Sequence, residues 1–387
     1  MFSAFFILLA WADPINLPLQ LKYQPMKNNY CVIMAGGVGA RFWPMSKTSK
    51  PKQFIDILGT GETLIQQTFN RFLKLCPPEN ILIVTNEQYK DLVMEQLPLI
   101  KENQVLLEPS RRNTAPCIAY ANHKILTENP DARIVVAPSD HIIMKEDVFV
   151  NVITEALEAV SENDWLLTLG IKPSRPDTGY GYIQYNSDQA YEKNNDIRKV
   201  KTFTEKPKLE MAQQFLESGD FLWNAGIFIW SLKSIMAAFE SHLPQVNSLF
   251  HAGMGKYNTD EEKAFIDETY SVCTNISIDY GVMEKASNVH VYAADFGWSD
   301  LGTWGSLYEI REKDENQNAI VGNNVMTYDS TNCIVNMPKN KLVVIQGLED
   351  FIIAEEDHSL LICRKQDEQM IRNIVNDIRI EKGEHYT

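Results

Sequence analysis

Short apolar runs alternate with amphipathic segments between residue 30 and about residue 169. The amphipathic segments, such as TLIQQTFNRFLKL, TAPCIAYANHKIL and EDVFVNVITEALEAV, carry apolar residues at three- and four-residue spacing, which predicts helices. The apolar runs are rich in Val, Ile and Leu and predict strands: YCVIMAG, NILIVTN, QVLLEP, RIVVAPSD and WLLTLGI. Strands and helices that alternate in this way indicate an α/β fold, a Rossmann-like, mostly parallel sheet with helices on both faces.

The pattern changes near residue 316, after a mixed stretch over residues 171–310. Five short β-like runs follow, separated by polar turns: NNVMTY, NCIVN, KLVVIQ, DFIIAE and SLLICR. They predict a small all-β module, and both a few coils of a β-solenoid and a small sandwich fit their spacing. A terminal helix is predicted over residues 367–380. We therefore divide the chain into an N-terminal extension outside the fold (1–26), an α/β domain (27–315) and a C-terminal β-rich module (316–387).

Composition and charge exclude several classes of protein. The chain is 44% hydrophobic and 22% charged, as in globular proteins, and its net charge of −15 argues against binding nucleic acid. The six cysteines are scattered without a C-x-x-C pair, so we expect buried free thiols and a reducing compartment. The run AFFILLAWA near the N-terminus resembles the apolar core of an export signal, but it follows no Lys or Arg and is too short to span a bilayer, which favours an upstream extension or a misassigned start. We therefore expect a cytoplasmic protein outside the membrane.

The segment MAGGVGARFWPMSKTSKPKQF, residues 34–54, follows the first predicted strand. It contains no G-x-x-x-x-G-K-[ST] sequence, and Phe42 stands where a dinucleotide-binding fingerprint needs its third glycine. Backbone amides of a glycine turn together with Arg and Lys make a site for a polyphosphate. A tight turn with solvated lysines is the structural alternative, but the density of cations favours phosphate. The predicted phosphate contacts are Gly36, Gly37, Gly39, Arg41 and Lys52.

Several further motifs along the chain support this interpretation. GGVGARFWPMSKTSKPKQF resembles the signature of the sugar nucleotidyltransferases, and specifically of the mannose-1-phosphate guanylyltransferases. FTEKP is similar to the family's F-V-E-K-P, with Thr204 in place of valine. Six further motifs follow the family's order: EPSRRNTAP, PSDH, TGYGYI, WNAGIFIW, SIDYGVMEKA and GWSDLGTW. The resemblance covers roughly residues 27–380 and implies a nucleotidyltransferase fold.

The resemblance implies a reaction in which mannose 1-phosphate attacks the α-phosphorus of GTP in line, giving GDP-mannose and pyrophosphate. A phosphate monoester has a second pKa of about 6, so the nucleophile is already ionised and needs no catalytic base. Catalysis then rests on positioning and electrostatic stabilisation. By resemblance, Arg41 holds the leaving phosphates, Lys52 lies near the α-phosphate and Lys206 neutralises the phosphate of the sugar. The predicted contacts to the sugar phosphate are Gly179, Glu205, Lys206 and Asn224.

Asp140 and Asp300 are the candidate ligands of a magnesium ion. Mg²⁺ prefers one or two carboxylates together with phosphate oxygens and waters, although either aspartate could instead cap a helix. His141 is either a ligand or an orienting group, with a structural role as the alternative. Nucleotide contacts are also expected after the strand that ends near residue 108, where Arg112 could alternatively pair with surface carboxylates. The nucleotide-binding candidates beyond the glycines are Glu108, Arg112, Asn113, Thr114 and Asp140.

Two other functions fit the same motifs. One is a catalytically inactive subunit that binds a nucleotide sugar and regulates a partner. Arg41, Lys52, Lys206 and Asp300 are all present, and this favours an enzyme. The other is a related transferase that uses a different hexose 1-phosphate. The C-terminal module either packs on the catalytic domain or forms the interface of a homodimer.

Overall fold

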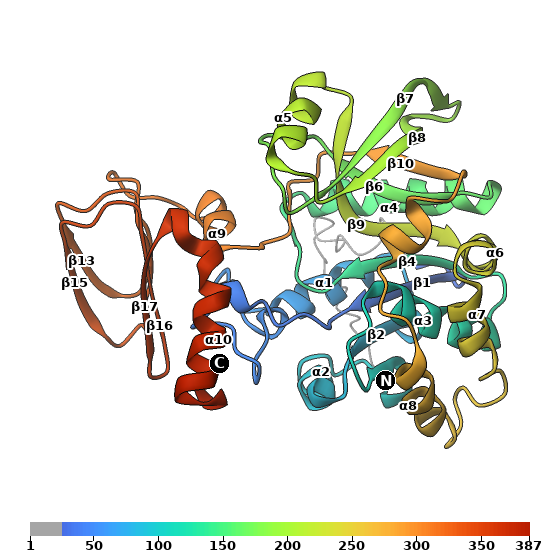
Figure 1. Ribbon diagram of the computed structural model, residues 1–387, viewed down its shortest axis with the longest axis horizontal. Helices are drawn as coiled ribbons and strands as arrows, with labels where there is room; N and C mark the ends of the chain where they lie inside the picture. The colour runs from blue at the N-terminus through green and yellow to red at the C-terminus, as the bar shows by residue number, and fades with distance from the viewer. Residues whose placement is uncertain (1–24) are drawn as a thin grey trace, which may run out of the picture.

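The computed structural model describes residues 25–387, so the predicted extension over residues 1–26 lies almost wholly outside the described residues. The α/β domain is built on a nine-stranded sheet with the strand order β3-β2-β1-β4-β9-β6-β10-β8-β7 (Figure 1). The bounds of these strands are β1 Asn29–Met34, β2 Ile81–Asn86, β3 Val105–Glu108, β4 Arg133–Pro138, β6 Leu166–Ile171, β7 Gly181–Tyr191, β8 Asn194–Glu205, β9 Phe221–Ser231 and β10 Val289–Ala293.

The predicted strands are β1, β2, β3, β4 and β6 of this sheet, and the predicted α/β fold is confirmed. β1 pairs in parallel with both β2 and β4, β2 pairs in parallel with β3, and β6 pairs in parallel with β10. β9 runs antiparallel between β4 and β6. The carboxyl ends of β1, β3 and β4 therefore lie at one edge of the sheet, where β9 begins.

Helices cover both faces because successive strand residues point to opposite sides. Val32 of β1 packs in the core with α3, α6, α7 and α8, whereas Ile33 packs in the core with α1, α2 and α4. The helices of this domain are α1 Leu64–Phe72, α2 Lys90–Gln96, α3 Thr114–Glu128, α4 Glu146–Glu162, α5 Leu209–Ser218, α6 Leu232–His242, α7 Pro244–His251 and α8 Glu262–Val272. Helices on both faces match the prediction from the apolar runs.

The C-terminal module is a solenoid rather than a sandwich. β12, β14 and β16 pair in parallel, with Ala319, Ile334 and Ile352 in register, and β13 pairs in parallel with β15. β17 then pairs antiparallel with β16. The helix α9, Trp304–Ile310, leads into the module, whose elements are β12 Ala319–Val321, β13 Asn324–Tyr328, β14 Ile334–Asn336, β15 Leu342–Gln346, β16 Phe351–Glu356, β17 Ser359–Arg364 and α10 Ile371–Lys382. The predicted terminal helix is α10, preceded by a 3-10 turn over Lys365–Met370.

A two-stranded antiparallel sheet links the segments that carry the two candidate metal ligands. It pairs β5, Ile142–Ile143, with β11, Trp298–Ser299. Asp140 lies just before β5 and Asp300 just after β11, so this small sheet brings two segments far apart in sequence to the same edge of the large sheet.

All six cysteines are free thiols, and five of them are buried, as predicted. Within residues 25–387, no helix has both the length and the apolar character needed to cross a bilayer.

Candidate active site

The glycine turn packs against Lys52, a lysine of the same segment. Gly39 has a φ of +72°, and a Cβ at this position would lie 2.6 Å from Cβ of Lys52, so both the backbone conformation and the space require glycine. The amide of Lys52 donates to the carbonyl of Val38 at 3.1 Å. At Gly37, by contrast, no described atom beyond its own residue and its two chain neighbours lies within 4 Å of the position that a Cβ would occupy. The turn therefore leaves open space beside Gly37 while it packs tightly at Gly39.

Lys52 is the central cation of the site. Its side chain is buried, and Nζ lies 2.8 Å from Oδ2 of Asp140. The same Nζ donates to the carbonyls of Asp300 at 3.0 Å and Leu301 at 2.8 Å. Burial raises the pKa of Asp140, but the neighbouring Lys52 and then His141 outweigh burial, and the net pKa is lowered below its ordinary value. Lys52 thus joins the predicted phosphate segment to both candidate metal ligands.

Asp300 is held by a residue that the sequence analysis did not single out. The hydroxyl of Tyr180 donates to Oδ1 of Asp300 at 2.7 Å, and the amide of Gly302 donates to the same oxygen at 3.1 Å. Burial and the charge of Asp300 raise the pKa of Tyr180, so the phenol keeps its proton and acts as a donor. Tyr180 lies inside the motif TGYGYI, but its reach to Asp300 depends on a contact across 120 residues of chain.

His141 lies beside these carboxylates in an orienting position. Nε1 of Trp298 donates to Nδ1 of His141 at 3.1 Å, so the neutral imidazole carries its proton on Nε2. Burial lowers the pKa of His141, and this effect exceeds that of the negative charges of Asp140 and Asp300, which raise it. This contact supports the orienting alternative for His141, because Nδ1 is already engaged.

The carboxylates suit a magnesium ion that is shared with a substrate. Across the described part of the chain, no cluster of three or more His, Cys, Asp and Glu side chains is placed to hold a metal. Asp300 uses Oδ1 for both of its hydrogen bonds, and no donor from residues 25–387 reaches its Oδ2. Mg²⁺ is commonly bound through one or two carboxylates together with substrate phosphates and waters. Asp140 and Asp300 fit that mode rather than an all-protein cage.

A second group of polar side chains gathers where β7, β8 and β9 meet. Glu205 forms an ion pair with Lys206, whose own side chain is largely exposed. Nδ2 of Asn224 donates to Oδ1 of Asp279 at 3.0 Å, while Oδ1 of Asn224 accepts from Thr168 at 2.9 Å. Three of the predicted sugar-phosphate residues therefore lie together with Asp279.

Asp279 is a member of this group that the sequence analysis missed, although it lies in the motif SIDYGVMEKA. Burial and the charge of Glu205 raise the pKa of Asp279 to about 6. The side chains that oppose this rise are Lys206 and the amide of Asn224, and both have a weaker effect on the pKa than burial. The signal that could have identified Asp279 is an acidic residue flanked by Ile278 and Tyr280 within that motif.

The loop between β6 and β7 carries the predicted Gly179 and an unpredicted cation. The amide of Gly179 donates to Oδ1 of Asp177 at 2.8 Å, so it is engaged within its own loop. The guanidinium of Arg175 donates to Oδ2 of Asp177 at 2.7 Å and lies 5.2 Å from the ring centroid of Trp223 and 5.9 Å from that of Tyr180. Arg175 thus places positive charge between the Tyr180–Asp300 pair and the β9 strand that bears Asn224.

Glu108 is a buried carboxyl next to the glycine turn. Its Oε2 lies 3.7 Å from the position of a Cβ on Gly36, and its Oε1 accepts from the hydroxyl of Tyr270 at 3.0 Å. Burial raises its pKa to about 7, against the opposing effects of Tyr270 and Arg111. Glu108 therefore lies where the sequence analysis expected a nucleotide-binding group.

The other residues of the predicted base segment have structural partners. Arg112 donates to the carbonyls of Tyr270 at 3.0 Å and Ser271 at 3.3 Å, near the end of α8. Oδ1 of Asn113 accepts from the amide of Thr114, whose Oγ1 accepts from the amide of Ile278 at 2.8 Å. These contacts fix the segment that leads into Asp279, and a nucleotide contact of Arg112, Asn113 or Thr114 remains a prediction.

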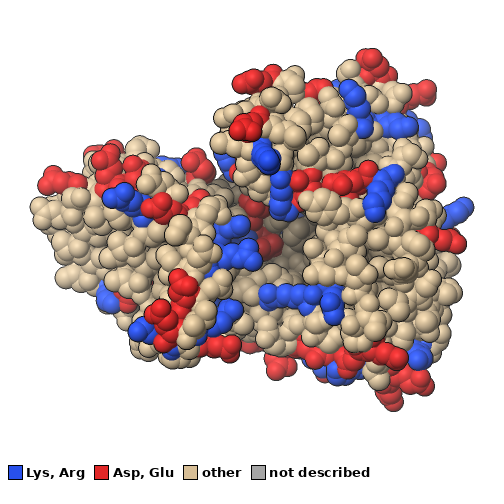
Figure 2. Space-filling model, viewed as in Figure 1, with Lys and Arg blue, Asp and Glu red and all other residues tan. Residues whose placement is uncertain are grey.

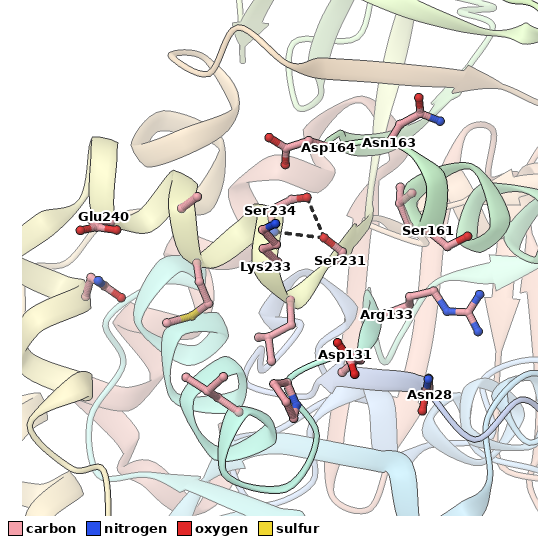
Figure 3. Close-up of a pocket in the computed structure, with 18 of the residues that line it drawn as sticks. Asn28, Asp131, Arg133, Ser161, Asn163, Asp164, Ser231, Lys233, Ser234 and Glu240 are labelled. Carbon is pink, nitrogen blue, oxygen red and sulfur yellow. Dashed lines mark hydrogen bonds between the residues drawn. The ribbon is translucent and has the colours of Figure 1, made fainter.

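Two hollows lie in the surface, and the predicted site residues do not line the second of them. Figure 2 shows a hollow between the C-terminal module and the body of the large sheet, with acidic and basic side chains in and around it. A separate cavity of about 1420 Å³ lies at the amino ends of β4 and β6, where Arg133, Asp164 and Ser231 line it (Figure 3). No predicted site residue lines this cavity. The predicted groups instead gather at the carboxyl edge, where ligands of open α/β sheets bind.

Known proteins resemble both parts of the chain. Residues 30–317 match the nucleotidyl transferase family, and residues 322–378 match the MannoseP isomerase/GMP-like beta-helix domain. The alginate biosynthesis protein AlgA of Pseudomonas aeruginosa is 34% identical over 350 residues, which are 90% of this chain and 71% of AlgA. The mannose-1-phosphate guanylyltransferase of Salmonella montevideo is 36% identical over 363 residues, which are 92% of this chain and 75% of that enzyme.

A solved structure resembles almost the whole chain. A protein of Thermus thermophilus, described as a mannose-1-phosphate geranyltransferase, has a TM-score of 0.80 and 28% identity, and the match covers 91% of this chain and 99% of that protein. These similarities confirm the resemblance inferred from the motifs and the β-solenoid character of the C-terminal module.

Proposed function

The chain belongs to the nucleotidyl transferase family, and on this premise we propose that it transfers GMP from GTP to mannose 1-phosphate, forming GDP-mannose and releasing pyrophosphate. Its relatives named mannose-1-phosphate guanylyltransferase support this choice of reaction. The observation that carries the proposal is the position of Lys52, near the end of the glycine segment. Its Nζ contacts the carboxylate of Asp140 and the backbone carbonyls of Asp300 and Leu301. A buried cation that is paired with the carboxylate of Asp140 and bonded to the backbone carbonyl of Asp300, next to open space at a glycine turn, suits a triphosphate and a divalent ion.

The chemistry requires two anions to meet. The phosphate of the sugar is ionised at neutral pH, so attack on the α-phosphorus needs charge neutralisation and alignment rather than a base. Arg41 would hold the leaving phosphates, because its guanidinium makes no hydrogen bond or ion pair within residues 25–387. Lys206, with its exposed ammonium, would neutralise the incoming sugar phosphate.

Asp140 and Asp300 would hold a magnesium ion, which supplies charge stabilisation to the phosphate oxygens when it is bound. Tyr180 orients Asp300 for this purpose by its hydrogen bond to Oδ1. Lys52 keeps Asp140 ionised and would face the α-phosphate. Glu205 and Asn224 would bind hydroxyl groups of the sugar.

Glu108 suits the recognition of guanine. An ionised carboxyl accepts hydrogen bonds from neighbouring N–H groups, and guanine presents such donors at N1 and N2. With a pKa of about 7, this carboxyl is partly ionised at neutral pH, and two N–H donors from a base would favour its ionised form. The free thiols agree with a reducing compartment, and we place the reaction in the cytoplasm.

A matrix of substrates tests the proposal. Each nucleoside triphosphate is combined with each of several hexose 1-phosphates in the presence of magnesium, and the release of pyrophosphate is measured. We expect the largest kcat/KM for GTP with mannose 1-phosphate. A larger value for another hexose 1-phosphate would support the alternative transferase, and binding of GDP-mannose without any turnover would support a regulatory subunit.

A further inference from the structure

The glycine segment is shared between the catalytic sheet and the C-terminal module. Phe42 and Trp43 lie in a buried cluster that includes Trp304, Ile371 and side chains of the solenoid strands. The ring centroids of Phe42 and Trp304 are 5.5 Å apart. α10 packs against the short helical turn Ala40–Phe42, and Figure 1 shows it between the solenoid and the early part of the chain. The residue next to Arg41 is therefore anchored in another module.

Polar contacts from separate parts of the module reach the same segment. Nε1 of Trp43 donates to the carbonyl of Tyr386 at 2.7 Å. Nζ of Lys47 lies 2.8 Å from Oδ2 of Asp357, which lies in the turn between β16 and β17. Nη2 of Arg379 on α10 donates to Oγ1 of Thr48 at 3.4 Å. These contacts hold residues 43–48 from the side opposite to the catalytic sheet.

Lys52 provides the second anchor of the segment, on the side of the catalytic sheet. Its contacts to Asp140 and Asp300 secure the end of the segment, while the module secures residues 42–48. Arg41 lies between the glycines and these anchored residues. Because the backbone of Phe42 continues directly from Arg41, the position of Phe42 controls where the guanidinium of Arg41 can reach.

We propose that the C-terminal module is a positioning element for the triphosphate. Its residues 357 and 371–387 hold residues 42–48 so that Arg41 and the glycine amides face the phosphates of the nucleotide. The inference rests on the proposed function of the glycine segment. We call the group formed by Glu205, Lys206, Asn224 and Asp279 the sugar end. Among the described residues it has no comparable link to the C-terminal module, because the contacts of Asn224 and Asp279 come from the α/β domain. The module should therefore affect the nucleotide more than the sugar phosphate.

The first test shortens the chain so that it ends at Lys382. This removes the carbonyl of Tyr386 and leaves the buried indole N–H of Trp43 without its acceptor, while Ile371 and Val375 of α10 remain in the shared core. We expect KM for GTP to rise about ten-fold and KM for mannose 1-phosphate to stay within about two-fold. An equal rise in both constants, or no rise in either, would overturn the positioning role.

A matched pair of substitutions repeats the test without shortening the chain. Asp357 and Asp350 are both exposed, both have a positive φ, and both lie near a lysine, but only Asp357 reaches the glycine segment. We expect Asp357→Asn to raise KM for GTP about two- to three-fold, because an exposed ion pair contributes little. Asp350→Asn should leave KM for GTP unchanged. Equal effects of the two substitutions would contradict the proposal, and this pair decides the question if the shortened chain does not fold.

Hydrogen exchange provides a readout that does not depend on turnover. We expect amides within residues 36–54 to exchange faster in the shortened chain than in the full chain, with unchanged exchange over residues 205–225. If the full chain does not turn over GTP, the proposed function fails, even when exchange shows that the module holds the segment. If the full chain turns over GTP and neither KM nor exchange changes in the variants, the positioning role alone fails.

Discussion

Asp140 and Asp279 are both partly buried carboxyls at the same edge of the sheet, yet their pKa values move in opposite directions. Asp140 has the ammonium of Lys52 at 2.8 Å, and its pKa is lowered. Asp279 has the neutral amide of Asn224 at 3.0 Å and the like charge of Glu205 nearby, and its pKa is raised to about 6. The difference shows that burial alone does not set the charge of a carboxyl: burial raises the pKa of both, and only at Asp140 does a neighbouring cation outweigh it.

The two environments match the needs of two kinds of ligand. Around Asp140, we propose that the buried cation of Lys52 and the carboxylates of Asp140 and Asp300 would receive phosphates and a metal ion. Around Asp279, we propose that the acidic and amide side chains bind the hydroxyl groups of a sugar, which donate hydrogen bonds to such acceptors, while Lys206 supplies positive charge for its phosphate.

The largest effect is expected from Asp300→Asn. The asparagine keeps an oxygen that can accept from Tyr180 but removes the charge that would bind magnesium, so we expect kcat to fall about 10³-fold or more. Steady-state rates over a magnesium titration measure this loss, and circular dichroism shows whether the fold is retained. Asp295→Asn is the control, since Asp295 is an exposed aspartate paired with Lys145. Normal turnover in the Asp300 variant would remove this residue from the metal site.

A smaller effect is expected on the free energy of unfolding in the absence of magnesium, and its sign differs between Asp140 and Asp279. Asp140→Asn leaves Lys52 buried without its counter-charge and should lower the free energy of unfolding at pH 7 by about 3 kcal/mol. Asp279→Asn removes a charge that burial disfavours and should raise it by about 1 kcal/mol. Urea unfolding of both variants measures the two changes.

The pH dependence follows from the same pKa values. The raised pKa of Asp279 means that the folded protein binds more protons than the unfolded chain between pH of about 4 and about 6, so this residue lowers stability as pH rises through that window. The lowered pKa of Asp140 has the opposite consequence, since its contribution to stability is lost as pH falls below its ordinary value of 3.8. Urea unfolding as a function of pH, compared between the protein and its Asp140→Asn and Asp279→Asn variants, measures the two contributions. If both aspartates changed the free energy of unfolding in the same direction as pH rises, the contrast would be wrong.

A separate effect, on KM, concerns the sugar end. Lys206→Ala removes an exposed cation beside Glu205, and we expect KM for mannose 1-phosphate to rise about 10- to 100-fold, as for the loss of a charge-assisted hydrogen bond. KM for GTP should stay within about two-fold. Initial-rate measurements with each substrate varied in turn separate the two constants. Lys208→Ala, two residues away, serves as the control, and an equal rise for both substrates would show that Lys206 does not belong to the sugar end alone.

Much of the fold could be predicted from the sequence because strand and helix periodicity is a local property. The apolar runs that became β1, β2, β3, β4 and β6 are buried on both faces, and such runs are recognisable without knowledge of their partners. Cation density after the glycine turn likewise indicated Lys52 before any contact was known. Tyr180 and Asp279 were missed although both lie within quoted motifs, because a motif does not say which of its members faces a distant partner.

By itself, the sequence determined the α/β class, the glycine segment and the order of the motifs, since each depends on neighbouring residues. Only the tertiary structure decided that the C-terminal strands stack in parallel as a solenoid, because strand pairing joins residues such as Ala319, Ile334 and Ile352 across turns of variable length. It also decided that Trp43 bonds to Tyr386 and that Tyr180 bonds to Asp300. Contacts of this kind arise from packing between distant segments, and no local periodicity encodes them.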